Sequence, residues 1–246
     1  IFIRHVQQLS IGRLRSLISR AAAAPAARRS ARAAASPTAA RRAGLLSNTA
    51  GIVTMHMGSG KGRLEPIFYV LDHSDVSPKN LLPTHMLRTP ELIDDGAELV
   101  RRGGYMDCTA GCTPDEMEQN AALILELLGR EGVSADHVTM SSDAFGSQPR
   151  FNERGECIGL TYASPKYLHQ TIQSLVRRGL PLEEALKLLT TTPANVLGQK
   201  EKKGCVMEGA DADLLVLGDH LAIESVFARG KTAVWNGEIL MKGRFE

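Results

Sequence analysis

Two histidines and an aspartate each close a short hydrophobic run in this sequence. His56 and His85 end two of these runs, and Asp143 follows a third run that begins at Val138. Neutral imidazole and carboxylate suit Zn²⁺ or a similar divalent ion, and a carboxylate can also take a proton from an activated water. A histidine at a strand end is often only structural, but three such residues favour a shared site. The pattern predicts that they converge at the carboxyl ends of strands, where α/β folds collect chemistry.

Two polar residues lie just beyond these strand ends. Arg88 follows His85 by three residues, and its planar fork suits a substrate carboxylate. Ser147 follows Asp143 across a loop that Gly146 lets turn sharply, so it could hydrogen-bond to a substrate. The alternatives are a surface salt bridge for Arg88 and a turn-capping hydroxyl for Ser147.

Two other patterns resemble known motifs but lack their spacing. The glycine-rich run 58–62 does not have the Walker A spacing, so we interpret it as the loop that follows the His56 run. Cys108 and Cys112 have the spacing of half a metal site, but no second Cys or His pair completes it. We therefore interpret the cysteines as reduced residues of a cytosolic protein.

Strand-like and helix-like runs alternate from about Gly51 onward. We expect strands that end at His56, His85, Cys108 and Ser142, and four βα units in succession imply parallel strands with right-handed crossovers. The expected helices span about 63–73, 89–102, 113–131 and 164–178, followed by two more that start near 180 and 192. The stretch 143–163 is expected to be a long loop.

The pattern changes to all-β after Cys205. Four short strands are expected at 212–217, 223–228, 231–235 and 239–242, with turns at Arg229-Gly230 and Asn236-Gly237. The fold class is therefore α/β, with a small C-terminal antiparallel β-module. We place the domain boundaries at 1–43, 44–203 and 204–246.

The first segment has an unusual composition. No acidic residue precedes Glu65, whereas Lys61 and ten arginines do. The remaining 18 basic and 27 acidic residues make an acidic body that carries a basic leader, so the net charge of +2 says little about nucleic acid. Residues 1–43 are rich in Ala, Arg and Ser, which is typical of a transit peptide, of aberrant sequence or of a solvated basic helix. We expect disorder or poorly packed helix there.

Three motifs resemble the isoaspartyl dipeptidases of the amidohydrolase superfamily. They are Thr54-Met55-His56-Met57-Gly58, Leu82-Pro83-Thr84-His85-Met86-Leu87-Arg88 and Ser141-Ser142-Asp143-Ala144-Phe145-Gly146-Ser147-Gln148-Pro149. The stretches 209–214 and 228–231 resemble the C-terminal β-module of that superfamily. The resemblance runs from about Gly44 to the end of the sequence.

The resemblance implies a fold, an activity and residue roles. The body would be the C-terminal half of a metal-dependent (β/α) barrel, and 204–246 would be part of a β-sandwich. The activity would be zinc-dependent hydrolysis of β-aspartyl dipeptides by metal-activated hydroxide. His56 and His85 would bind one zinc, Asp143 would bind the other and shuttle protons, Arg88 would hold a substrate carboxylate, and Ser147 would contact the aspartyl end.

The sequence also departs from that pattern. It has no His-x-His pair and no lysine before Lys61, although the family uses both for its two zinc ions. We therefore expect at most one partial zinc site and low activity of this chain alone. The alternatives are an inactive fragment that acts as an assembly partner and a dihydropyrimidinase-like cyclic amidohydrolase. We expect a small dipeptide substrate, a homo-oligomer, and neither nucleic acid nor membrane as a partner. The expected location is cytoplasmic, or organellar if 1–43 is a transit peptide.

Overall fold

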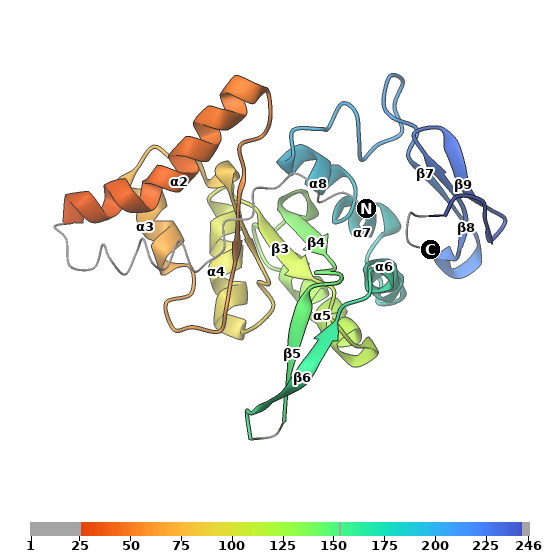
Figure 1. Ribbon diagram of the computed structural model, residues 1–246, viewed down its shortest axis with the longest axis horizontal. Helices are drawn as coiled ribbons and strands as arrows, with labels where there is room; N and C mark the ends of the chain where they lie inside the picture. The colour runs from red at the N-terminus through yellow and green to blue at the C-terminus, as the bar shows by residue number, and fades with distance from the viewer. Residues whose placement is uncertain (1–25, 153, 243–246) are drawn as a thin grey trace.

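A computed structural model of the chain describes residues 26–152 and 154–242 (Figure 1). In the first part of the fold, strands and helices alternate along the chain as the sequence predicts. The helices are α2 (Ala26–Ser47), α3 (Glu65–His73), α4 (Pro90–Arg101), α5 (Pro114–Leu128), α6 (Lys166–Arg177), α7 (Leu182–Lys187) and α8 (Thr191–Val196). Short 3₁₀ helices span Pro78–Asn80, Ala135–His137 and Asp219–Leu221. The predicted α/β class is confirmed.

Four parallel strands form the centre of the fold. They are β1 (Val53–His56), β2 (Leu81–Thr84), β3 (Met106–Thr109) and β4 (Val138–Ser141). β1 pairs with β2 and β3 pairs with β4, both in parallel. Beyond the end of β2, the Met86 amide donates to the Asp107 carbonyl at 3.2 Å, which joins the two pairs. The carboxyl ends of all four strands therefore lie along one edge.

Helices α4 and α5 bury one face each against these strands. The side chains of Thr89 and Thr113 cap them by accepting from the amides of Leu92 and Glu116, and a proline follows each cap. The buried face of α5 consists of Met117, Ala121, Ile124 and Leu127. Burying a leucine side chain contributes roughly 2 kcal/mol, so these helices hold the strands in place.

The region after β4 differs from its prediction as a long loop. It contains β5 (Ser147–Phe151) and β6 (Cys157–Tyr162), which pair antiparallel with an irregularity beside Phe151. Pro149 and Gly159 obscured the strand pattern in the sequence. The hairpin extends away from the rest of the fold (Figure 1), and Ile158 and Leu160 on β6 are exposed.

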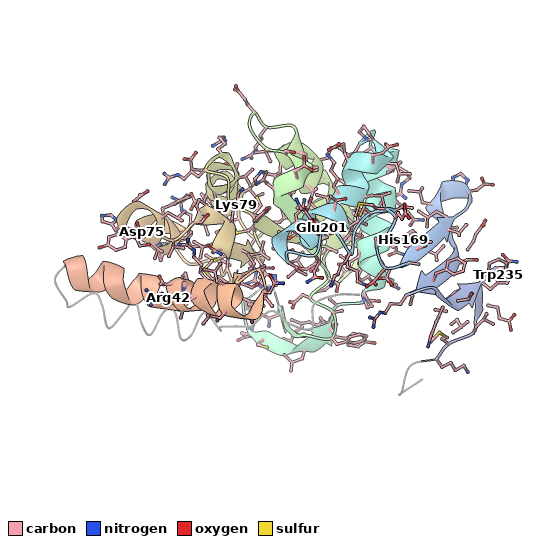
Figure 2. The ribbon with its side chains drawn as sticks, turned by 90° about the horizontal axis from the view of Figure 1, so that it is seen from above. Arg42, Asp75, Lys79, His169, Glu201 and Trp235 are labelled. Carbon is pink, nitrogen blue, oxygen red and sulfur yellow. The ribbon has the colours of Figure 1, made fainter. Side chains whose placement is uncertain are left out.

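The C-terminal residues form the predicted antiparallel sheet. Its order is β10 (Glu238–Ile239), β9 (Lys231–Trp235), β8 (Ile223–Ala228) and β7 (Leu214–Leu217). Arg229 and Asn236 have positive φ at the first turn positions, each followed by a glycine with positive φ, so the two predicted tight turns are confirmed. Trp235 lies at the side of this module that is remote from α2 (Figure 2).

The segment predicted to be a basic leader is partly described. Residues 26–43 belong to α2, which packs beside α3, and Ala40 contacts the core. Figure 2 shows Arg42 on this helix, with Asp75 nearby on the adjoining segment. The remainder of the predicted leader, residues 1–25, lies outside the described part of the chain. Within the described residues, no helix has the length and hydrophobicity required to cross a bilayer.

Candidate functional site

The two predicted histidines meet at the carboxyl ends of β1 and β2. His56 is the last residue of β1, and His85 follows the last residue of β2. Nδ1 of His56 lies 2.9 Å from Nε2 of His85, and the rings are tilted by 53°. Because neutral imidazole has one donor and one acceptor nitrogen, one ring donates and the other accepts in this pair.

Asp143 reaches the same place from β4. Its Oδ2 lies 3.9 Å from Nε2 of His85, and its side chain is one quarter exposed. The backbones of His85 and Asp143 both adopt left-handed conformations, with φ of 65° and 48°. The backbone therefore turns sharply just after β2 and again just after β4, and the two side chains approach one another. The structure thus brings together all three residues whose convergence the sequence predicts, whereas their metal-binding roles stay predictions.

The environment of His85 keeps its imidazole neutral. The pKa of His85 is lowered from 6.5 to about 4, chiefly by burial and then by the positive charge of Arg88, while Asp143 acts in the opposite direction. Nδ1 of His85 is hydrogen-bonded to the Thr109 hydroxyl at 2.7 Å. That contact fixes the ring orientation and leaves Nε2 directed at His56 and Asp143, as metal-binding histidines require.

The other two predicted residues are placed differently. Arg88 is exposed in the connection between β2 and α4, close enough for its charge to act on His85. The backbone of Ser147 starts β5 and pairs with Tyr162. The side chain of Ser147 lies outside the described part of the chain, so its predicted contact stays a prediction.

A buried carboxylate beneath the histidines was not singled out from the sequence. Asp107 lies in the middle of β3 and is 5% exposed. Its Oδ2 accepts from the hydroxyls of Thr84 at 2.5 Å and Ser141 at 2.6 Å, and its Oδ1 accepts from Thr139 at 2.7 Å. Burial raises its pKa to about 6, although the three hydroxyl donors act to lower it. A charged residue inside a hydrophobic strand was the signal that could have identified it.

The donor atoms of His56, His85 and Asp143 have the type and spacing that a zinc ion takes. Two ligands of one tetrahedral zinc lie about 3.3 Å apart, given metal–nitrogen bonds of about 2.0–2.1 Å. The separations of 2.9 Å and 3.9 Å bracket that value, and the two nitrogens and one carboxylate oxygen are of the right type. Across residues 26–152 and 154–242, however, no group of three or more His, Cys, Asp or Glu side chains is arranged to hold a metal. The three residues therefore fit a partial ligand set.

The four cysteines are all free and take no part in this arrangement. Cys108 is buried in β3, where desolvation raises its pKa well above the ordinary thiol value. Cys112 lies beyond the end of β3, and its amide donates to the Glu116 carboxylate at 2.7 Å. Cys108 therefore packs within the core, and Cys112 belongs to the segment that starts α5.

The chain is similar to known proteins in both sequence and structure. Residues 46–234 match the sequence profile of the amidohydrolase family. The structure is similar to that of β-aspartyl dipeptidase from Fervidobacterium islandicum AW-1 in complex with a β-Asp-Leu dipeptide, with a TM-score of 0.72 and 35% identity. A second structure of the dipeptidase from that organism gives a TM-score of 0.68 and 32% identity. Both similarities cover 85% of this chain.

The matched proteins are longer than this chain. The two similarities cover 53% and 52% of the dipeptidase chains, so this chain spans about half their length. N-acetylglucosamine-6-phosphate deacetylase from Rattus norvegicus is 38% identical over 60 residues, which are 24% of this chain and 14% of that protein. The dipeptidases therefore share the larger part of the fold described above.

Proposed function

This chain belongs to the amidohydrolase family, and from that premise we propose that it hydrolyses β-aspartyl dipeptides with the help of zinc. The observation that supports the proposal is the convergence of His56, His85 and Asp143 at the ends of three strands. The likeness to two dipeptidase structures supports the choice of substrate. We further propose that β1 to β4 form the C-terminal half of a (β/α) barrel.

The proposed zinc ligands are His56 through Nδ1, His85 through Nε2 and Asp143 through its carboxylate. Zinc, when bound, supplies Lewis acidity that activates water and polarises the scissile carbonyl. His85 is suited to this role because its lowered pKa keeps the ring neutral at pH 7. Thr109 holds the other ring nitrogen, so the orientation of His85 does not depend on the metal.

Two further steps fall to residues of this chain. Asp143 would accept a proton from the attacking water and return it to the leaving amine, which is general acid–base catalysis. Arg88 would bind a carboxylate of the dipeptide through paired N–H donors, because its side chain is exposed and its positive charge lies close enough to act on His85. Ser147 is the proposed contact for the aspartyl end of the substrate.

A substrate panel tests this function directly. The chain, supplied with zinc, would be assayed on β-Asp-Leu, on α-Asp-Leu and on a cyclic amide such as dihydrouracil, with Asp143→Asn as the control. Release of leucine from β-Asp-Leu alone, lost in Asp143→Asn, is the expected result. Turnover of dihydrouracil instead would favour a dihydropyrimidinase-like enzyme, and no turnover of any substrate would reject catalysis by this chain.

A second candidate is an assembly role without catalysis. Leu215, Trp235 and Ile239 of the C-terminal sheet are each more than half exposed, which suits contact with another protein surface. We propose self-association as the form that this would take. Light scattering after size exclusion would reveal a dimer or larger species if this is correct, whereas a stable monomer would argue against it.

A further inference from the structure

We propose that Asp107 is a positioning residue that locks the ends of β2 and β4 and thereby sets where His85 and Asp143 stand. The inference rests on the proposed function for the use made of those two residues. It concerns a carboxylate that has no place in the ligand set or in the proton transfers described above. Its evidence is the pattern of hydrogen bonds that converge on one buried side chain.

Asp107 joins three strands through its two carboxylate oxygens. It lies on β3, Thr84 is the last residue of β2, and Ser141 is the last residue of β4. Both of those hydroxyls donate to the same oxygen, Oδ2, at 2.5 Å and 2.6 Å. Thr139 of β4 donates to Oδ1 at 2.7 Å and so fixes the plane of the carboxylate. The separation of the two flanking strand ends is therefore set by one side chain.

The locked residues are next to the ones that need positioning. Thr84 directly precedes His85, and Ser141 stands two residues before Asp143. Both His85 and Asp143 have left-handed backbones, which non-glycine residues keep only where the surrounding structure over-determines them. The hydroxyl bonds to Asp107 supply that constraint immediately before each turn.

The same strand also orients the ring of His85. Thr109, two residues after Asp107 on β3, holds Nδ1 of His85 at 2.7 Å. Backbone bonds from Met86 to the Asp107 carbonyl and from Ala110 to the Ser141 carbonyl tie the turns to β3. β3 thus serves as the reference to which both neighbouring strand ends are fixed.

The hydrogen bonds of Asp107, rather than its charge, do the positioning. Burial raises its pKa to about 6, so ionised Asp107 at neutral pH opposes folding relative to its protonated form. Asparagine could satisfy the same partners, because its oxygen can accept from Thr84 and Ser141 while its N–H₂ group donates to Thr139. The Thr139 hydroxyl can then turn toward the Met106 carbonyl, 3.5 Å away. Positioning by hydrogen bonds therefore predicts that Asp107→Asn retains the site.

The test compares four variants of the full chain. Asp107→Leu removes both acceptors, Asp107→Asn keeps the hydrogen bonds, and Ser141→Ala removes one donor. Ser174→Ala is the control, because the Ser174 hydroxyl likewise donates to a carboxylate, that of Glu118 at 2.7 Å, between α6 and α5. Zinc dissociation constants would be measured by chelator competition. Amide hydrogen exchange at Met86 and Ala110 and ¹⁵N signals of the imidazoles would be measured with EDTA present.

The expected result is a graded loss at this site alone. Zinc should bind about tenfold more weakly to Asp107→Leu than to wild type, as is typical when a group that supports a metal ligand is lost. It should also bind more weakly to Ser141→Ala than to wild type. The zinc affinity of Asp107→Asn should stay within about threefold of wild type. Exchange at Met86 and Ala110 should accelerate in the first two variants, and the His85 signals should move. Ser174→Ala should change none of these.

Each contrary result would overturn the proposal. If Asp107→Asn loses zinc as Asp107→Leu does, the charge matters rather than the positioning. If Ser141→Ala and Ser174→Ala behave alike, the hydroxyl bonds have no special effect on the site. The exchange and imidazole measurements need neither zinc nor peptide, so they decide the matter even if the proposed hydrolysis fails. Ser141→Ala keeps the test open if Asp107→Leu does not fold.

Discussion

Nδ1 of His56 lies 2.9 Å from Nε2 of His85, although the two histidines are 29 residues apart in the sequence. Each ends or directly follows a parallel strand, and β1 pairs with β2 in a register that sets His56 opposite Thr84. The pairing of β1 with β2 therefore determines that the two imidazoles face each other. A cation that takes both nitrogens must replace their mutual hydrogen bond, so metal and proton compete for the pair.

Removing the hydroxyl of Thr109 should weaken zinc binding. Thr109→Val keeps the shape of the side chain but removes the partner of His85 Nδ1, so the ring can rotate away from His56. Loss of such a supporting contact typically weakens metal binding by about 10-fold or more. Chelator competition measures the effect, and Thr161→Val on β6 is the control. Equal zinc affinities of the two variants would show that Thr109 does not orient the ring.

Asp107 should make the stability of the fold depend on pH. Its pKa is raised from 3.8 to about 6 in the folded state, so the folded chain holds this proton more tightly than the unfolded chain does. The resulting stability is fully present below about pH 4 and is lost as the pH rises to about 6. At 1.36 kcal/mol per pKa unit, the free energy of unfolding falls by about 3 kcal/mol across that interval.

Urea unfolding of wild type and Asp107→Asn with EDTA present measures this contribution. Burial lowers the pKa of His85 to about 4, so His85 adds stability as the pH rises from about 4 to about 6.5. Wild type and Asp107→Asn share this contribution of His85, so the difference between their free energies of unfolding reports the contribution of Asp107 alone. Relative to the variant, wild type should lose about 3 kcal/mol between pH 4 and pH 7. Parallel pH profiles of the two proteins would contradict the raised pKa.

The sequence was sufficient to predict the convergence of the histidines with Asp143. Each of these residues closes a hydrophobic run, and parallel strands in successive βα units end at the same edge of a sheet. The positive φ values at His85 and Asp143 were not predictable, because neither residue is a glycine. The predicted role of Ser147 stays untested, since its side chain is outside the described residues.

Asp107 and the β5–β6 hairpin were missed for different reasons. The partners of Asp107 come from two other strands, so only the register of β2, β3 and β4 shows that they meet. The hairpin is interrupted by Pro149 and Gly159, and its strands pair with each other rather than with the parallel strands. Short-range patterns carry little information on either feature.

Two glycines with similar backbones should respond differently to alanine. Gly204 and Gly209 have φ of 80° and 86°, but a Cβ at Gly204 would lie 2.5 Å from the Thr190 carbonyl, whereas one at Gly209 meets nothing within 4 Å. Gly209→Ala should cost about 1 kcal/mol from the left-handed backbone alone. Gly204→Ala should cost about 3 kcal/mol, because overpacking adds to that strain. Urea unfolding measures both, and equal losses would contradict the close approach.

The amount of zinc per chain tests the central claim most directly. Protein purified without added chelator would be analysed for zinc beside the double variant His56→Ala/His85→Ala. Close to one zinc per chain is expected in wild type, with loss of that zinc in the double variant, because the two facing nitrogens supply two of the three proposed ligands. Wild-type protein without zinc, or equal zinc in both proteins, would contradict the assignment of His56 and His85 as ligands.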